Sequence, residues 1–89
     1  LRRVLTRELE SRGFRVDARA GAAGVVEDAA QDPPDVVLLD LRLPDEDGMS
    51  VLRALRERDP DAQVVVLTGH GSIEHAVEAM RQGAHDFLT

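Results

Sequence analysis

The sequence predicts an α/β fold in which helices cover a parallel sheet, formed by a single domain of 89 residues. Residues 36–39 and 64–67 are short apolar runs rich in β-branched residues, which is typical of buried strands. The stretches around them carry apolar residues at helical spacing. Strands that alternate with helices form βα units with right-handed crossovers, and such units make a parallel sheet.

The first third of the chain predicts a helix, a strand and a second helix. Residues 1–12 have apolar side chains at helical spacing, and Gly13 supplies a C-terminal stop. Residues 14–18 alternate apolar and polar side chains, which indicates an edge strand. Residues 21–31 predict a short alanine-rich helix, which ends before two prolines at 33 and 34 because proline cannot continue a helix.

The remaining elements follow in alternation. Residues 36–39 predict a strand that is buried on both faces, since four apolar residues stand in a row. An amphipathic helix is expected over 49–58 and a strand over 64–67. The next helix runs over 72–82 from Ser72 as N-cap, and a strand begins near the end of the chain. That helix carries the apolar residues Ile73, Ala76, Val77 and Met80.

Asp40 is the main candidate for chemistry. It follows directly after an apolar strand, and open parallel sheets bind ligands beyond the carboxyl ends of their strands. Thr68 and Gly69 follow the next strand in the same way. If the two strands are parallel neighbours, a carboxylate, a hydroxyl and a glycine-rich loop meet at one edge, which suits a small anion. The alternative is that Asp40 only caps the turn after its strand.

Composition excludes several classes of function. With 11 basic and 17 acidic residues, the net charge of −6 argues against direct contact with nucleic acid, which needs a clustered positive surface. The chain has no cysteine, which agrees with a cytoplasmic protein. No apolar run approaches the roughly 18–20 residues of a membrane span.

Three stretches together resemble the receiver domain of bacterial two-component response regulators: residues 38–44 with Gly48, residues 66–69 and residues 83–89. Residues 68–71 and 83–89 are similar to receivers of nitrogen-regulation-type transcriptional activators. The resemblance spans the chain and implies a flavodoxin-like doubly wound parallel sheet (CheY-like) of strand order 2-1-3-4-5. Residues 1–89 then form a partial receiver domain that lacks strand 1, most of strand 5 and the last helix.

The resemblance also implies a function. Asp40 would be the phosphoacceptor for a sensor histidine kinase and would control an output domain in the same longer chain, such as a transcriptional one. Thr68 matches the switch hydroxyl, and Phe87 matches the aromatic switch, whose alternative role is simply to fill the core. Gly69 would leave the phosphoryl site open.

A Mg²⁺ ion is part of the implied site, because a cation must offset the repulsion between a carboxylate and a phosphoryl group. The matching ligands are Asp40 and the backbone carbonyl of Arg42. The family's acidic pair would precede Leu1, and its lysine would follow Thr89, so Mg²⁺ binding by these 89 residues is expected to be weak or absent. The acids at 45–47 are expected to be solvated surface, and the three histidines lack the spacing of metal ligands.

Two other interpretations remain open. A degenerate receiver would act only as a protein–protein interaction module through residues 72–82, without phosphorylation. An aspartate-nucleophile phosphohydrolase, the enzymatic reading, needs a second acid two residues after the nucleophile, where this chain has Arg42. Because a sheet without its central strand has open edges, we expect either that the protein has more residues than these 89 or that a second copy supplies the missing strand in a homodimer.

Overall fold

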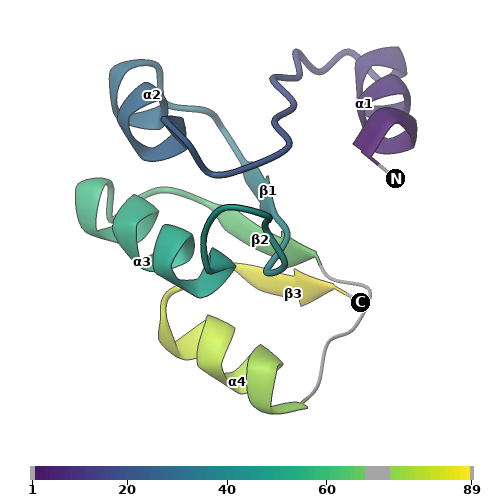
Figure 1. The fold of residues 1–89 in the computed structure, drawn as a ribbon. Coiled ribbons are helices and arrows are strands. Elements are labelled where there is room, and N and C mark those ends of the chain that lie inside the picture. Colours follow the sequence, from purple (N-terminus) through teal and green to yellow (C-terminus); the bar gives the residue numbers. More distant parts are fainter. Residues whose placement is uncertain (1, 68–72, 89) are drawn as a thin grey trace.

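The computed structural model describes residues 2–67 and 73–88, which form four helices and three strands (Figure 1). Helices and strands alternate from the second helix onward, as the sequence predicts. The elements are α1 (Arg2–Ser11), α2 (Val25–Gln31), β1 (Val37–Leu39), α3 (Gly48–Arg58), β2 (Val64–Leu67), α4 (Ile73–Arg81) and β3 (Asp86–Leu88).

The three strands form one parallel sheet in the order β1-β2-β3. Leu39 pairs with Val66 of the central strand, and Val66 pairs with Phe87 on its other side. In-register residues of parallel strands point to the same face, so these three side chains form a row across the sheet. The parallel α/β architecture predicted from the sequence is confirmed.

The core lies on the face of the sheet that carries this row. Val64 and Val66 of β2 have no exposed surface, and neither does Leu52 of α3. Helix α4 adds Ala79, which is also fully buried. Figure 1 shows α3 and α4 on the same side of the sheet. These helices therefore fix the strands from one side, and the side chains they bury are mainly valine, leucine and alanine.

The opposite face of the sheet is open to solvent. Leu38 and Leu88 point to this face and are 45% and 47% exposed. The prediction that residues 36–39 are buried on both faces is therefore wrong. Successive side chains of a strand alternate between faces, and within residues 2–67 and 73–88 the helices cover only one of them.

The segment 14–18 is not a strand, in contrast to the sequence prediction. Its first residue continues the end of α1, since the Phe14 N–H donates to the Leu9 carbonyl at 3.1 Å, next to Gly13 with φ +94°. Phe14 is 59% exposed. A strand needs a partner for its ladder, and the sheet of the described residues has β1, not this segment, at its edge. Figure 1 shows α1 and this segment set apart from the sheet.

Two helices differ from their predicted form. Helix α2 begins at Val25 and not at 21, because residues 21–24 form a turn that ends at Gly24 with φ +74°. In helix α4 the buried side chain is Ala79. The apolar side chains Ile73, Val77 and Met80, which have helical spacing, are exposed. Leu1, Ser72 and Thr89 lie outside the described residues. Within the described ranges, no helix is long and apolar enough to cross a membrane.

Candidate functional site

Asp40 lies directly after β1, at the carboxyl end of the sheet, and its side chain is exposed. Its Oδ1 accepts a hydrogen bond from the backbone N–H of Arg42 at 2.8 Å. This bond turns the carboxylate back over its own loop and orients it. The carboxylate is thus exposed to solvent in the crevice position of a parallel sheet.

The loop after Asp40 is closed at its base. Arg42 and Asp47 form an isolated antiparallel bridge, and the Gly48 N–H donates to the Leu41 carbonyl at 3.3 Å. Gly48 lies so close to the strand end that a Cβ on it would be 2.5 Å from the Leu41 Cα and 2.7 Å from the Asp40 carbonyl oxygen. Only glycine permits this approach, which brings Asp40 next to the start of α3.

The Asp40 carboxylate and the Arg42 backbone carbonyl provide oxygen atoms of the type that hard cations bind. Mg²⁺ is usually held by one or two carboxylates and retains several waters. Asp40 offers a carboxylate, and the Arg42 carbonyl belongs to the same turn. The two donors fit part of a magnesium shell, and no cluster of three or more acidic, histidine or cysteine side chains that could hold a metal exists in the described part of the chain.

The acids at 45–47 are exposed, as the sequence predicts, but two of them also accept hydrogen bonds from backbone N–H groups. Asp47 is the N-cap of α3 and accepts from the Met49 N–H at 3.1 Å. Asp45 accepts from the N–H of Ala22 at 2.9 and 3.1 Å and from the N–H of Ala23 at 3.1 Å. The hydrogen bond from Ala22 is the largest cause that lowers the pKa of Asp45 below its usual value. Both carboxylates therefore already accept hydrogen bonds from backbone N–H groups.

Phe87 lies two strands away from Asp40. It pairs with Val66, which pairs with Leu39, so it is level with the residue before Asp40 and about 10 Å away at the usual strand spacing. Its ring is half-buried and packs against the core. Thr68 and Gly69, the other predicted site residues, lie outside the described residues. They follow β2, the strand between β1 and β3.

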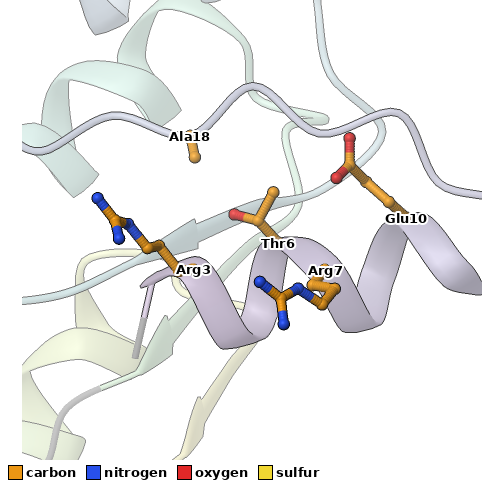
Figure 2. A pocket seen from close by; sticks show the side chains of 5 residues that line it. All are labelled: Arg3, Thr6, Arg7, Glu10 and Ala18. Atoms are coloured by element: carbon orange, nitrogen blue, oxygen red, sulfur yellow. The ribbon is translucent and has the colours of Figure 1, made fainter.

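Two hollows lie elsewhere on the molecule. One, of about 320 Å³, lies between α1 and the segment after it, and Figure 2 shows Thr6 directed from the helix toward the backbone near Ala18. It is also lined by Arg3, Arg7 and Glu10. The other, of about 450 Å³, includes Arg56 and His85 near the amino ends of β2 and β3. Asp40 lines neither of these two hollows.

Sequence reasoning included Gly48, together with residues 38–44, in the resemblance, but it did not predict the close approach of Gly48 to Leu41, and it missed the role of Asp45. The contact of Asp45 with Ala22 joins residues 23 positions apart. No local pattern reports such a distant pair, so only the structure reveals it.

The chain is similar to known proteins along its whole length. The sequence model described as "Response regulator receiver domain" matches residues 1–89. The C4-dicarboxylate transport transcriptional regulatory protein DctD of Pseudomonas aeruginosa is 43% identical over 88 residues. That match covers 99% of this chain but only 19% of DctD, so the chain spans about a fifth of that regulator.

Solved structures give the same picture. A response regulator from Burkholderia pseudomallei, with a phosphorylated aspartic acid, calcium ion and citrate, matches with a TM-score of 0.87 and 34% identity over 96% of this chain and 50% of that one. The beryllofluoride-activated NtrC4 receiver domain dimer matches with a TM-score of 0.88 and 34% identity over 97% of this chain and 71% of that one.

Proposed function

Because the chain belongs to the family of response regulator receiver domains, we propose that Asp40 accepts a phosphoryl group from a sensor histidine kinase. One Asp40 carboxylate oxygen bonds to phosphorus while the bond from phosphorus to the donor nitrogen breaks, and the donor imidazole keeps the electron pair. The carrying observation is the exposed Asp40 carboxylate at the carboxyl end of β1, oriented by the Arg42 N–H.

The neighbouring residues support this role. Asp40 and the Arg42 carbonyl would provide part of the shell of a Mg²⁺ ion, which when bound neutralises charge between carboxylate and phosphoryl oxygens. The B. pseudomallei relative holds both a phosphorylated aspartic acid and a calcium ion, which supports the pairing of an acceptor with a divalent cation. Gly69 would keep access to Asp40 open.

The proposed response is a change of conformation. Thr68 would bond the phosphoryl group and draw its loop inward, and Phe87 would then alter its packing at the edge of the sheet. The ring is half-buried against the core, so a change in its position alters contacts in β3 and α4. A phosphoryl group shifts such an equilibrium only through contacts that differ between the two states.

The proposed partners follow from the family. They are a sensor histidine kinase, an output domain in the same longer cytoplasmic protein, and a second copy of the receiver. The dimer formed by the NtrC4 receiver supports self-association. The domain itself is regulatory, and we assign it neither contact with nucleic acid or membrane nor catalytic turnover.

A second candidate is a receiver that only binds a protein partner. Its support is the apolar stripe of α4, in which Ile73 is 83% exposed and Val77 and Met80 are exposed beside it. In this case the surface of residues 72–82 carries the function and Asp40 only terminates β1.

The test is intact-mass measurement of the full-length protein after incubation with acetyl phosphate and Mg²⁺. We expect one added phosphoryl group, its loss in Asp40→Asn, and normal labelling in Asp35→Asn, which changes an exposed aspartate at the other end of β1. A folded protein that stays unlabelled would overturn phosphotransfer and favour the binding module.

A further inference from the structure

We propose that Asp45 is a positioning residue for the acceptor loop, and that it couples Asp40 to the turn that precedes α2. This inference rests on the proposed function of Asp40. It starts from the contact between the Asp45 carboxylate and the backbone N–H groups of Ala22 and Ala23. This contact is called the latch.

The latch holds the loop at the end opposite its base. The base of the loop is fixed by the bridge of Arg42 with Asp47 and by the Asp47 cap on α3. Asp45 lies in the segment between those two residues, where Pro44 and Glu46 are exposed. The carboxylate therefore ties the tip to a distant part of the chain and restricts the tilt of the whole loop.

The turn that donates to Asp45 leaves space for its carboxylate at Gly21. A Cβ on Gly21 would lie 2.8 Å from Asp45 Oδ1 and 2.9 Å from Oδ2, so a side chain there would displace the acid. Ala22 is 6% exposed and belongs to the core, which makes the turn a firm anchor. Ala22 and Ala23 together donate to both carboxylate oxygens.

The latch matters for chemistry because the loop carries the Arg42 carbonyl, which would bind the cation together with Asp40 at the end of β1. A tilt of the loop moves the Arg42 carbonyl relative to Asp40, and small misplacements of ligand groups are costly. Coupling is reciprocal, so a cation or phosphoryl group that changes the loop must also change the turn at residues 21–24. The turn leads into α2, so a change in the turn would also change the position of α2.

Four variants of the full-length protein separate contact from charge. Asp45→Ala removes the latch, and Asp45→Asn keeps one acceptor oxygen without the charge. Gly21→Ala keeps the charge but displaces the carboxylate. Glu46→Gln is the matched control, since Glu46 is the next acid in the exposed loop and, among the described residues, its side chain makes no hydrogen bond or ion pair with residues 21–23.

The first readout is the Mg²⁺ concentration that gives half-maximal phosphorylation rate with acetyl phosphate. We expect an increase of about tenfold for Asp45→Ala and for Gly21→Ala, the size typical of lost support around a metal ligand. Asp45→Asn should fall between these variants and the wild type, and Glu46→Gln should match the wild type. Equal shifts in Asp45→Ala and Glu46→Gln would overturn the latch, because loop charge alone would explain them.

The second readout does not depend on phosphorylation. Amide hydrogen exchange at Ala22 and Ala23 should be slow in the wild type and in Glu46→Gln, and fast in Asp45→Ala and Gly21→Ala. Wild-type exchange as fast as in Asp45→Ala would overturn the latch. If the wild type is never phosphorylated but shows the expected exchange, the function of Asp40 fails while the latch stands. If the wild type is phosphorylated but Asp45→Ala changes neither the half-maximal Mg²⁺ concentration nor the amide exchange, only the latch fails.

Discussion

Gly48 packs its α-carbon against the backbone that carries Asp40. The space left for a side chain is smaller than a methyl group, since a Cβ would lie 2.7 Å from the Asp40 carbonyl oxygen. The obstructing atoms are backbone atoms and not flexible side chains. This contact sets the distance between Asp40 and the first turn of α3.

Gly48→Ala should therefore destabilise the protein by about 1–3 kcal/mol, the usual cost of overpacking, because backbone must move to admit the methyl group. Urea denaturation followed by circular dichroism measures the change. Gly13→Ala is the control, since nothing lies within 4 Å of a Cβ there and only its φ of +94° opposes alanine. A Gly48→Ala loss no larger than that of Gly13→Ala would contradict the steric argument.

Asp47→Ala should cost about 1 kcal/mol, because it removes the oxygen that accepts from the Met49 N–H at the start of α3. Asp47→Ser should restore most of this loss, since serine is also a good N-cap. The same denaturation experiment tests both variants. If Asp47→Ser is as unstable as Asp47→Ala, capping is not the role of this side chain.

Leu52→Ala should reduce the free energy of unfolding by about 2–5 kcal/mol, as expected for a cavity in a packed core. Leu52 has no exposed surface and lies in α3 among the residues that cover the sheet. Val4→Ala, at a side chain that is 67% exposed, should change stability by less than about 0.5 kcal/mol. Similar losses for the two variants would mean that α3 does not pack as described.

The stability that Asp45 contributes should depend on pH. Hydrogen bonds from Ala22 lower the pKa of Asp45 in the folded state, so the folded protein holds its proton less tightly than the unfolded chain. The contribution is therefore present above the unfolded pKa of about 3.9 and is lost as the pH falls through the lower folded value.

Denaturation of the wild type and Asp45→Asn over a pH series measures this contribution. The stability difference should be constant near neutral pH and shrink as the pH falls below about 4. Glu46→Gln, which removes a neighbouring charge, serves as the comparison. A difference between wild type and Asp45→Asn that stays constant across the acid range would rule out the assigned hydrogen bonds.

Arg56 joins three elements at the end of the sheet away from Asp40. Its guanidinium donates to the Ala62 carbonyl at 2.7 Å and to the Pro60 carbonyl, and its side chain packs against Gly83. Arg56→Ala should lower stability by about 1–3 kcal/mol, as for lost hydrogen bonds from a charged donor. Phosphorylation of the folded variant should be normal, and mass labelling together with denaturation checks both parts. A specific loss of labelling would show that this region acts on the site.

The sequence predicted those features that local patterns specify. Helical spacing located α1 and α3 to within one or two residues, and β-branched runs located β1 and β2. The placement of Asp40 after β1 followed from the same pattern. The alternating pattern at 14–18 led to a wrong strand prediction, because an alternating segment forms a strand only when a neighbouring strand supplies hydrogen-bond partners. Similarly, apolar spacing in α4 does not say which side meets the sheet.

Contacts between distant segments could not be predicted in this way. Asp45 and Ala22 meet because the loop after β1 folds toward the turn before α2, and an acidic residue in a turn looks like solvated surface in the sequence. The same limit applies to the close approach of Gly48 to Leu41, which depends on backbone geometry and not on side-chain chemistry.

The bridge between Arg42 and Asp47 also decides where the chain can change in length. The bridge and the bond from Gly48 to Leu41 close a short ring of backbone, and only residues 43–46 lie inside it. A residue inserted before Arg42 or after Asp47 would shift Asp40 relative to α3, whereas one inserted at 43–46 would enlarge a surface turn. Insertions at 43–46 would therefore leave in place the bridge that sets the distance from Asp40 to α3, but they would move Asp45 relative to Ala22.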